Sequence, residues 1–229
     1  MSLISPSQPA KRHQLVVLIS GSGSNLQAFI DAAQQGVLNA DIAAVISNKT
    51  GVKGLERAAD AGIANEVIDH RQFADRESFD RELASRIDHY NPDLVILAGF
   101  MRILTPEFVD HFAGHIMNIH PSLLPKYPGL HTHQRAIEAG DKTAGATVHF
   151  VTSELDGGPA IIQAEVPILD GDDADTLAAR VLTQEHQIYP LAAQWFCEGK
   201  LSLRDNVPQL NGEPLPPSGF TFSGATNQP

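Results

Sequence analysis

The sequence predicts an α/β fold: a single domain with a doubly wound, mostly parallel sheet, completed by a C-terminal antiparallel strand pair and a long helix. Short β-rich runs alternate with helical patterns between residues 14 and 167, which is typical of βαβ units. The first run, residues 15–19, is apolar throughout, as expected for a strand buried on both faces. With 229 residues, 42% hydrophobic and 19% charged, the chain is large enough for one such domain.

The first half of the chain predicts alternating strands and helices. Strands are expected over residues 15–19, 42–46, 63–68, 94–97 and 116–119. Helices are expected from Asn25 onward and over residues 55–61 and 76–90. Together these segments predict the parallel part of the sheet with helices on both of its faces.

The second half predicts a different connectivity. Residues 134–139 predict a short helix that Gly140 ends, and the runs 146–151 and 160–168 predict a hairpin-like pair. Asp172 and Asp173 supply capping carboxylates for a long helix through residue 195, which Pro190 is expected to kink or break.

Composition divides the chain into three regions. Residues 1–13 predict a flexible N-terminal arm, residues 14–204 the folded domain, and residues 205–229, rich in Pro, Gly and Asn, an extended C-terminal tail. The arm contains no apolar core of the kind that a secretory signal needs.

Charge and composition favour small-molecule partners. A net charge of -11 and a pI near 5.2 argue against nucleic acid, which is bound through basic grooves. No apolar run approaches the ~20 residues that a membrane helix needs, so no membrane partner is expected. The single cysteine, Cys197, excludes an intrachain disulfide and fits a reducing compartment, so a cytoplasmic location is expected. The oligomeric state does not follow from the sequence.

Asn118 and His120 form the clearest candidate for a site that handles a carbonyl group. In an extended segment residues i and i+2 point to the same face, roughly 6.5–7 Å apart. An amide offers fixed N–H donors, and an imidazole can donate, accept or carry charge near neutral pH. Asp156, followed by two glycines and a proline, is a turn carboxylate that can orient and charge His120, although turn chemistry alone also favours an Asp there.

The turn over residues 21–25 is a candidate phosphate site, because it follows a buried strand and opens a helix whose free N–H groups attract anions. The alternative is a tight βα turn without a ligand. No Gly-Lys-Ser/Thr follows, which excludes a nucleoside-triphosphate P-loop, and the second strand leads into Asn48 and Lys49 rather than the acidic residue of a dinucleotide site. A phosphomonoester therefore fits better than NAD.

Two other groups of residues are ambiguous. The segment 97–104 follows a buried strand and mixes apolar residues with Gly99, so it suits a flat, partly apolar ring, but its apolar side chains are equally suited to the core. His131 and His133 form an H-x-H pair near His120, yet no recognisable zinc spacing accompanies them, so pocket-lining roles are favoured over metal binding.

Four motifs resemble the phosphoribosylglycinamide formyltransferases, folate-dependent enzymes of purine biosynthesis. They are ISGSGSNLQ at 19–27, LAGFMRIL at 97–104, NIHPSLLPKYPGLHTH at 118–133 and LDGGP at 155–159. The resemblance runs from about residue 14 to residue 217 with the motifs in the family's order. It implies a Rossmann-like formyltransferase fold and transfer of a formyl group from 10-formyltetrahydrofolate to the amine of 5'-phosphoribosylglycinamide, without a metal.

The resemblance also implies roles for individual residues. Asn118, His120 and Asp156 match the catalytic positions of the family. The substrate positions, for the phosphate and the glycinamide end, are Gly23, Ser24, Asn25 and Glu185. The folate positions are Arg76, Met101, Arg102, Ile103, Leu104, Thr152, Ser153, Glu154, Leu155, Asn118 and Asp156.

Related activities fit less well. A methionyl-tRNA formyltransferase is expected to carry a further C-terminal module and a basic face, which this acidic chain does not match, and a formyltetrahydrofolate deformylase an extra N-terminal domain, whereas the first strand here is expected at about residue 14. A sugar-amine formyltransferase would share the chemistry but take a nucleotide-sugar acceptor. A Rossmann-type oxidoreductase would use the 21–25 turn, and a folate-binding protein without activity would not need Asn118, His120 and Asp156 together.

Overall fold

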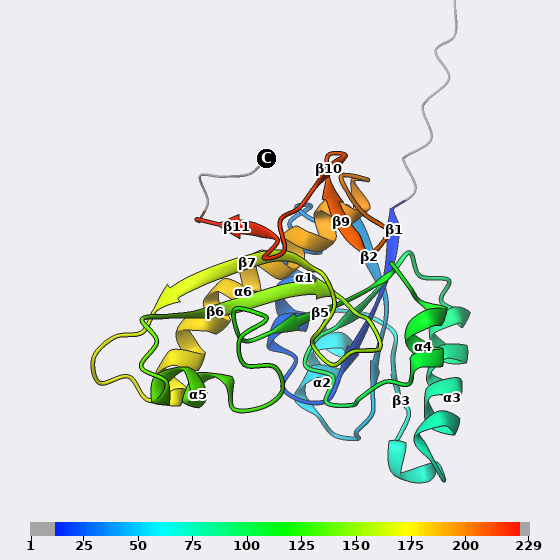
Figure 1. Cartoon of the computed structure of the whole chain (residues 1–229). Coiled ribbons are helices and arrows are strands. Elements are labelled where there is room, and N and C mark those ends of the chain that lie inside the picture. The colour runs from blue at the N-terminus through cyan, green and yellow to red at the C-terminus, as the bar shows by residue number, and fades with distance from the viewer. Residues whose placement is uncertain (1–11, 225–229) are drawn as a thin grey trace, which may run out of the picture.

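The computed structural model describes residues 12–224, which form a central eight-stranded sheet covered by helices on both faces (Figure 1). Its strand order is β11-β7-β6-β5-β4-β1-β2-β3. Five adjacent strands pair in parallel, in the order β3-β2-β1-β4-β5. They are β1 (His13–Ile19), β2 (Ala40–Ser47), β3 (Asn65–Val67), β4 (Leu94–Leu97) and β5 (Ile116–His120). The predicted doubly wound, mostly parallel sheet is thus confirmed.

Alternation along β1 divides the core into two layers. Leu15, Val17 and Ile19 belong to one buried cluster, and Val16 and Leu18 to the other, because successive side chains of a strand point to opposite faces. The first cluster receives apolar residues of α1 (Ser24–Gln34), α2 (Lys53–Asp60) and α6 (Ala174–Cys197). The second receives those of α3 (Arg76–His89) and α4 (Pro106–His111), which lie together at one side of Figure 1.

Beyond β5, the large sheet contains antiparallel strand pairs. β6 (Thr143–Phe150) pairs antiparallel with both β5 and β7 (Ala160–Pro167), so the predicted hairpin-like pair is confirmed. The turn between β6 and β7 carries Asp156. The short helix α5 (Thr132–Glu138) lies between β5 and β6 and begins two residues before its predicted start.

Helix α6 runs along the sheet for 24 residues. The side chain of Asp173 accepts the Thr176 N–H and caps its first turn, as the sequence predicts. Of the two outcomes expected at Pro190, the break is wrong, since the helix continues past it to Cys197, and the kink stays a prediction. Just before Pro190, the Tyr189 hydroxyl lies 2.9 Å from the carbonyl oxygens of Leu97 and Met117, which joins α6 to β4 and β5.

The described part of the C-terminal region is paired with the domain rather than free. β9 (Val207–Leu210) pairs with β8 (Leu201–Arg204) and β10 (Glu213–Pro214) in a small antiparallel sheet. β11 (Phe220–Phe222) joins the edge of the large sheet beside β7. The extended tail that the composition predicts does not include these pairings, of which those of β9 are local, whereas β11 pairs with β7 far away in the sequence.

Smaller differences concern the boundaries and one missed helix. α4 and a single 3-10 turn, η1 (His70–Gln72), were not expected from the sequence. β3 is shorter than the predicted run 63–68. Of the expected N-terminal arm, residues 1–11 lie outside the described residues, while His13 already belongs to β1. Across residues 12–224, no helix combines the length and apolarity that crossing a membrane requires.

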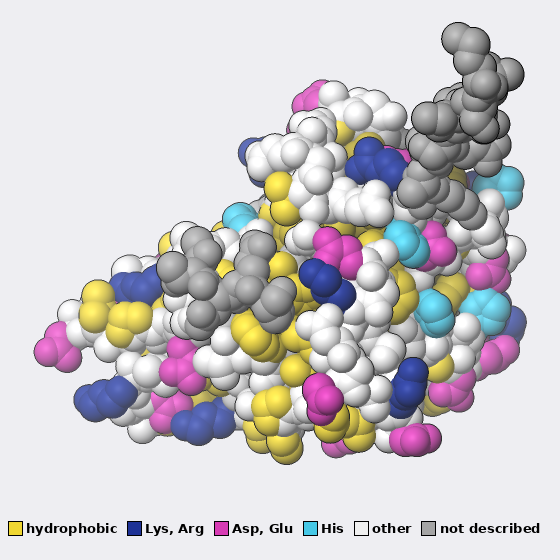
Figure 2. Space-filling view, turned by 90° about the horizontal axis from the view of Figure 1, so that it is seen from above, with side chains coloured by type: hydrophobic (Ala, Val, Ile, Leu, Met, Phe, Trp, Pro, Cys, Tyr) yellow, Lys and Arg dark blue, Asp and Glu magenta, His cyan; other side chains and the backbone are white. Residues whose placement is uncertain are grey.

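The surface is mixed in charge. Figure 2 shows Lys and Arg side chains interspersed with Asp and Glu on the face seen from above. The chain as a whole carries 16 Lys and Arg against 27 Asp and Glu.

Candidate active site

Asn118 and His120 lie at the end of β5, where the carboxyl ends of parallel strands meet. Asn118 is opposite Leu97 of β4 on one side and His149 of β6 on the other, and His120 is opposite Thr147. His120 is 5% exposed, whereas Asn118 is half-buried. The predicted pair therefore shares one face of one strand.

Asp156 reaches His120 from the turn between β6 and β7. Its Oδ1 lies 3.4 Å from His120 Nδ1, and its Oδ2 accepts the Gly129 N–H at 2.8 Å. The turn is tight at Gly158, where a Cβ would meet the Phe150 carbonyl oxygen at 1.8 Å. The glycine-rich turn thus delivers the carboxylate to the imidazole, which sequence alone did not establish.

The second ring nitrogen of His120 also faces an acceptor. Nε2 lies 2.9 Å from the Tyr127 carbonyl oxygen, which can only accept, so Nε2 carries a hydrogen. An ionised Asp156 likewise can only accept at Nδ1. Both ring nitrogens of His120 therefore face acceptor oxygens, with the closer contact at Nε2.

His149 is a member of the site that sequence reasoning missed. Its Nδ1 lies 2.9 Å from the Phe150 carbonyl and so carries the hydrogen, which leaves Nε2 to accept from Asn118 Nδ2 at 3.2 Å. Burial lowers the pKa of His149 and keeps the ring neutral. The neutral ring therefore orients the Asn118 amide. No local signal marks His149, because its position opposite Asn118 depends on the pairing of β5 with β6.

A cavity of about 110 Å³ opens beside Asn118, His149 and Asp156. Of the predicted folate residues, the lining includes Arg102, Ile103, Leu104, Thr152, Ser153, Glu154, Leu155 and, from the catalytic set, Asn118 and Asp156. Met101 is not among them and is 61% exposed, and Arg76 is half-exposed at the start of α3. The structure thus gathers most of the predicted folate residues around the catalytic ones and leaves Arg76 and Met101 outside the cavity wall.

The turn over residues 21–25 leads from β1 into α1. Gly23 adopts a left-handed conformation with φ 69°, and a Cβ there would lie 2.7 Å from the Cα of Gly54. Arg57 Nε donates to the Ser22 carbonyl at 2.9 Å and fixes the turn from outside. No side chain caps α1, so the N–H groups around Ser24 remain available to an anion.

Asn25 and Glu185 meet at the same turn, although they are far apart in sequence. Asn25 Nδ2 donates to Glu185 Oε2 at 2.8 Å. Burial raises the pKa of Glu185, and the hydrogen bond from Asn25 opposes that effect. The carboxyl group is therefore held near the phosphate candidate with one oxygen fixed.

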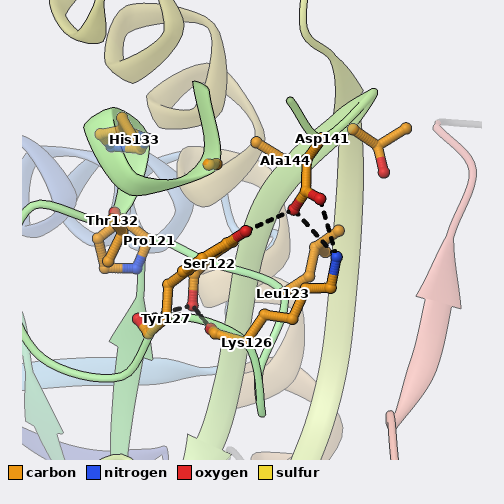
Figure 3. A pocket seen from close by; sticks show the side chains of 11 residues that line it. Pro121, Ser122, Leu123, Lys126, Tyr127, Thr132, His133, Asp141 and Ala144 are labelled. Carbon is orange, nitrogen blue, oxygen red and sulfur yellow. Dashed lines mark hydrogen bonds and ion pairs between the residues drawn. The ribbon is translucent and has the colours of Figure 1, made fainter. Parts of the chain in front are cut away.

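His133 lines a second cavity, of about 280 Å³, shown in Figure 3. In it the Tyr127 hydroxyl and the Lys126 ammonium both bind Asp141, at 2.9 and 3.0 Å. Burial and then the charge of His120 lower the pKa of His133. None of Asn118, His120 and Asp156 lines this cavity, which instead holds the segment that presents the Tyr127 carbonyl.

Metal ligation by the H-x-H pair finds no support in the geometry. Within the described residues 12–224, no group of three or more His, Cys, Asp or Glu side chains is arranged to hold a metal ion. His131 has φ 57° at the start of α5, and its side chain makes no capping bond.

Known proteins resemble the chain along most of its length. The formyl transferase family model matches residues 13–193. A phosphoribosylglycinamide formyltransferase of Escherichia coli is 57% identical over 206 residues, covering 90% of this chain and 97% of its own length. One of Haemophilus influenzae is 51% identical and covers 90% and 98%.

A solved structure agrees in three dimensions. The phosphoribosylglycinamide formyltransferase of Coxiella burnetii superposes with a TM-score of 0.90 at 49% identity, covering 93% of this chain and 100% of its own. The family model, the sequence identities and the shared fold all lead to one conclusion. The chain belongs to the phosphoribosylglycinamide formyltransferases.

Proposed function

We propose that this protein transfers the formyl group of 10-formyltetrahydrofolate to the amine of 5'-phosphoribosylglycinamide, giving the formylglycinamide ribonucleotide and tetrahydrofolate. The observation that carries the proposal is that Asn118 and Asp156 line one cavity and that Asp156 contacts His120 behind it. The unpaired, buried Cys197 is compatible with a cytoplasmic location.

Substrate binding is assigned to two places. The N–H groups of Gly23, Ser24 and Asn25 bind the phosphate at the start of α1, and Glu185 binds the glycinamide end next to Asn25. The folate lies in the cavity between the segments 101–104 and 152–156, with its formyl group toward Asn118. Arg76 and Met101, which are exposed and lie outside the cavity wall, contact its solvent-facing part.

Attack by the amine does not require a strong base. A glycyl amine has a pKa of ~8, so a useful fraction is neutral at physiological pH. Its lone pair attacks the formyl carbon, and the carbonyl π electrons move to oxygen. The free N–H of Asn118 and a ring N–H of charged His120 stabilise this oxyanion. His120 Nε2 already donates to the Tyr127 carbonyl, so the oxyanion must share or replace that contact.

Collapse of the tetrahedral intermediate completes the transfer. The bond between the formyl carbon and the folate nitrogen breaks, and the attacking nitrogen loses a proton while the leaving nitrogen gains one. Asp156 keeps His120 charged and relays the proton through water. We propose that no metal takes part, because the amide and imidazole supply the donors that a Lewis acid would otherwise provide.

A formyl-transfer assay tests the proposed reaction. Purified protein with both substrates should consume 10-formyltetrahydrofolate only when phosphoribosylglycinamide is present, and treatment with EDTA followed by desalting should leave the rate unchanged. A panel of amino sugars linked to nucleotides serves as the competing acceptor set. Turnover with those acceptors and none with phosphoribosylglycinamide would reject the assignment.

A further inference from the structure

The segment 101–104 presents large apolar side chains to solvent. Met101 is 61% exposed and Ile103 is 59% exposed, while the guanidinium of Arg102 lies 5.5 Å from the centre of the Phe79 ring. Exposed side chains contribute little burial energy, so this segment does not owe its shape to packing alone. Its shape depends on the hydrogen bonds that hold its backbone.

One buried hydrogen bond holds the beginning of the segment. The Met101 N–H donates to Ser20 Oγ at 2.8 Å, and the Ser20 hydroxyl donates to Asn48 Oδ1 at 2.6 Å. Ser20 is 5% exposed and Asn48 1% exposed. Ser20 directly precedes the turn over residues 21–25, so this anchor also connects the segment to the phosphate candidate.

A second buried hydrogen bond holds its end. The Thr105 N–H donates to Asp80 Oδ2 at 2.6 Å, and Asp80, on α3, is only 2% exposed. Among the described residues, Asp80 Oδ1 has no hydrogen-bond partner. Burial raises the pKa of Asp80, and the Thr105 hydrogen bonds and the charges of Arg76 and Arg102 oppose that effect. A buried, half-satisfied carboxyl is costly to keep for stability alone.

We infer that Ser20 and Asp80 are positioning residues for the folate co-substrate, each holding one end of the segment 101–104 against the cavity beside Asn118. The inference rests on the proposed function, which assigns the folate to this cavity. Asp80 acts on the folate alone, because it touches only the distal end of the segment. Ser20 acts on both substrates, because it also adjoins the turn over residues 21–25.

Asp80→Ala and Ser20→Ala test this division by steady-state kinetics. Loss of one hydrogen bond corresponds to about a tenfold weakening. Asp80→Ala should therefore raise the KM for 10-formyltetrahydrofolate about tenfold and weaken binding of 5,8-dideazafolate, a stable folate analogue, by a similar factor. Its KM for phosphoribosylglycinamide and its kcat should stay within about twofold. Ser20→Ala should raise both KM values.

Asp80→Asn and Asp172→Asn serve as matched variants. Asp80→Asn keeps an oxygen that accepts the Thr105 N–H, so it should partly restore the KM for 10-formyltetrahydrofolate. Asp172 also accepts a backbone N–H, from Leu169 at 2.8 Å, but it lies in the β7–α6 connection, so Asp172→Asn should change neither KM.

Unchanged folate KM and analogue affinity in Asp80→Ala, with only a lower Tm, would overturn the role of Asp80. If that variant does not fold, an unchanged folate KM in Asp80→Asn has the same meaning. A rise confined to the folate KM in Ser20→Ala would overturn its link to the phosphate turn. Failure of the wild-type protein to transfer formyl at all would instead reject the proposed function.

Discussion

His120 meets an acceptor at each ring nitrogen. Asp156 Oδ1 lies 3.4 Å from Nδ1, and the Tyr127 carbonyl 2.9 Å from Nε2. A hydrogen on each ring nitrogen would serve both acceptors, which is the charged state that the proposed mechanism uses.

Replacing Asp156 by Asn tests the source of that charge. Asp156→Asn keeps the shape of the turn but removes the negative charge facing Nδ1, so His120 should carry less positive charge at pH 7 and kcat should fall by about 10² or more. Nitrogen chemical shifts of the ring in NMR report the change directly. Identical ring shifts in the wild type and the variant would show that Asp156 does not hold the charge.

His149 should matter through Asn118. His149→Phe fills the same space but removes both the acceptor for the Asn118 amide and the donor to the Phe150 carbonyl. With the amide free to rotate, kcat should fall about 5- to 10-fold, as expected for one misdirected hydrogen bond, while both KM values change little. His89→Ala, at an exposed position on α3, is the control. A kcat equal to that of the control would show that His149 does not contribute to catalysis.

Elements bring these residues together by their order in the sheet. β5 is parallel to β4 and antiparallel to β6, so the end of β6 lies beside the start of β5, and the turn after β6 folds back along β5 to bring Asp156 to His120. Asp173 caps α6 from the connection after β7, and Asp172 beside it pairs with Arg180 at 2.6 Å. The cap at Asp173 fixes where the long helix begins.

The Asp172–Arg180 pair predicts a pH-dependent stability. Hydrogen bonds from Arg180 and from the Leu169 backbone lower the pKa of Asp172 to about 2. Since this value lies below the ordinary 3.8, the stabilisation is present above pH 3.8 and is lost as the pH falls toward 2. Asp172→Asn should lower Tm by about 2–5 °C at pH 7, and the difference from wild type should shrink below pH 4. A difference in Tm that does not change with pH would contradict this account of the pair.

β11 forms one edge of the large sheet, and the composition of its segment did not predict a strand there. Phe220 of β11 contacts Trp195 of α6, with ring centres 5.3 Å apart. The strand adds to β7 through residues about 58 positions away, as Phe220 pairs with Ile162. Residues 219–224 thus contribute to the fold despite their loop-like composition.

Phe220→Ala tests that contribution. Loss of the half-buried ring should cost about 1–2 kcal/mol and lower Tm by several degrees, because the face of Trp195 is then exposed. The kinetic constants at 25 °C should stay the same, since the change is far from Asn118 along the sheet order. Thr221→Ala, at an exposed position of the same strand, is the control. Equal Tm values for the two variants would mean that the Phe220 ring adds nothing to stability.

The features that the sequence predicts correctly are those marked by a local sequence pattern. The apolar run at 15–19, the capping residue Asp173 and the glycine turn at 21–25 each carry their own signal, and each lies where it was expected. Asn118 and His120 share a strand, so their common face also follows from spacing. What sequence does not reveal depends on distant pairing: His149 opposite Asn118, Asp80 beneath Thr105, and β11 beside β7.

Single-turnover formyl transfer by Asn118→Ala and His120→Ala is the most direct test of the catalytic assignment. With enzyme in excess over 10-formyltetrahydrofolate and with phosphoribosylglycinamide saturating, each variant should lose about 10² to 10³ in the rate of transfer, because each lacks one donor to the oxyanion. Affinity for 5,8-dideazafolate should remain within a few-fold of wild type. Exposed Asn39→Ala and His89→Ala are the matched controls and should transfer at the wild-type rate. A transfer rate within a few-fold of wild type in either active-site variant would contradict the assignment.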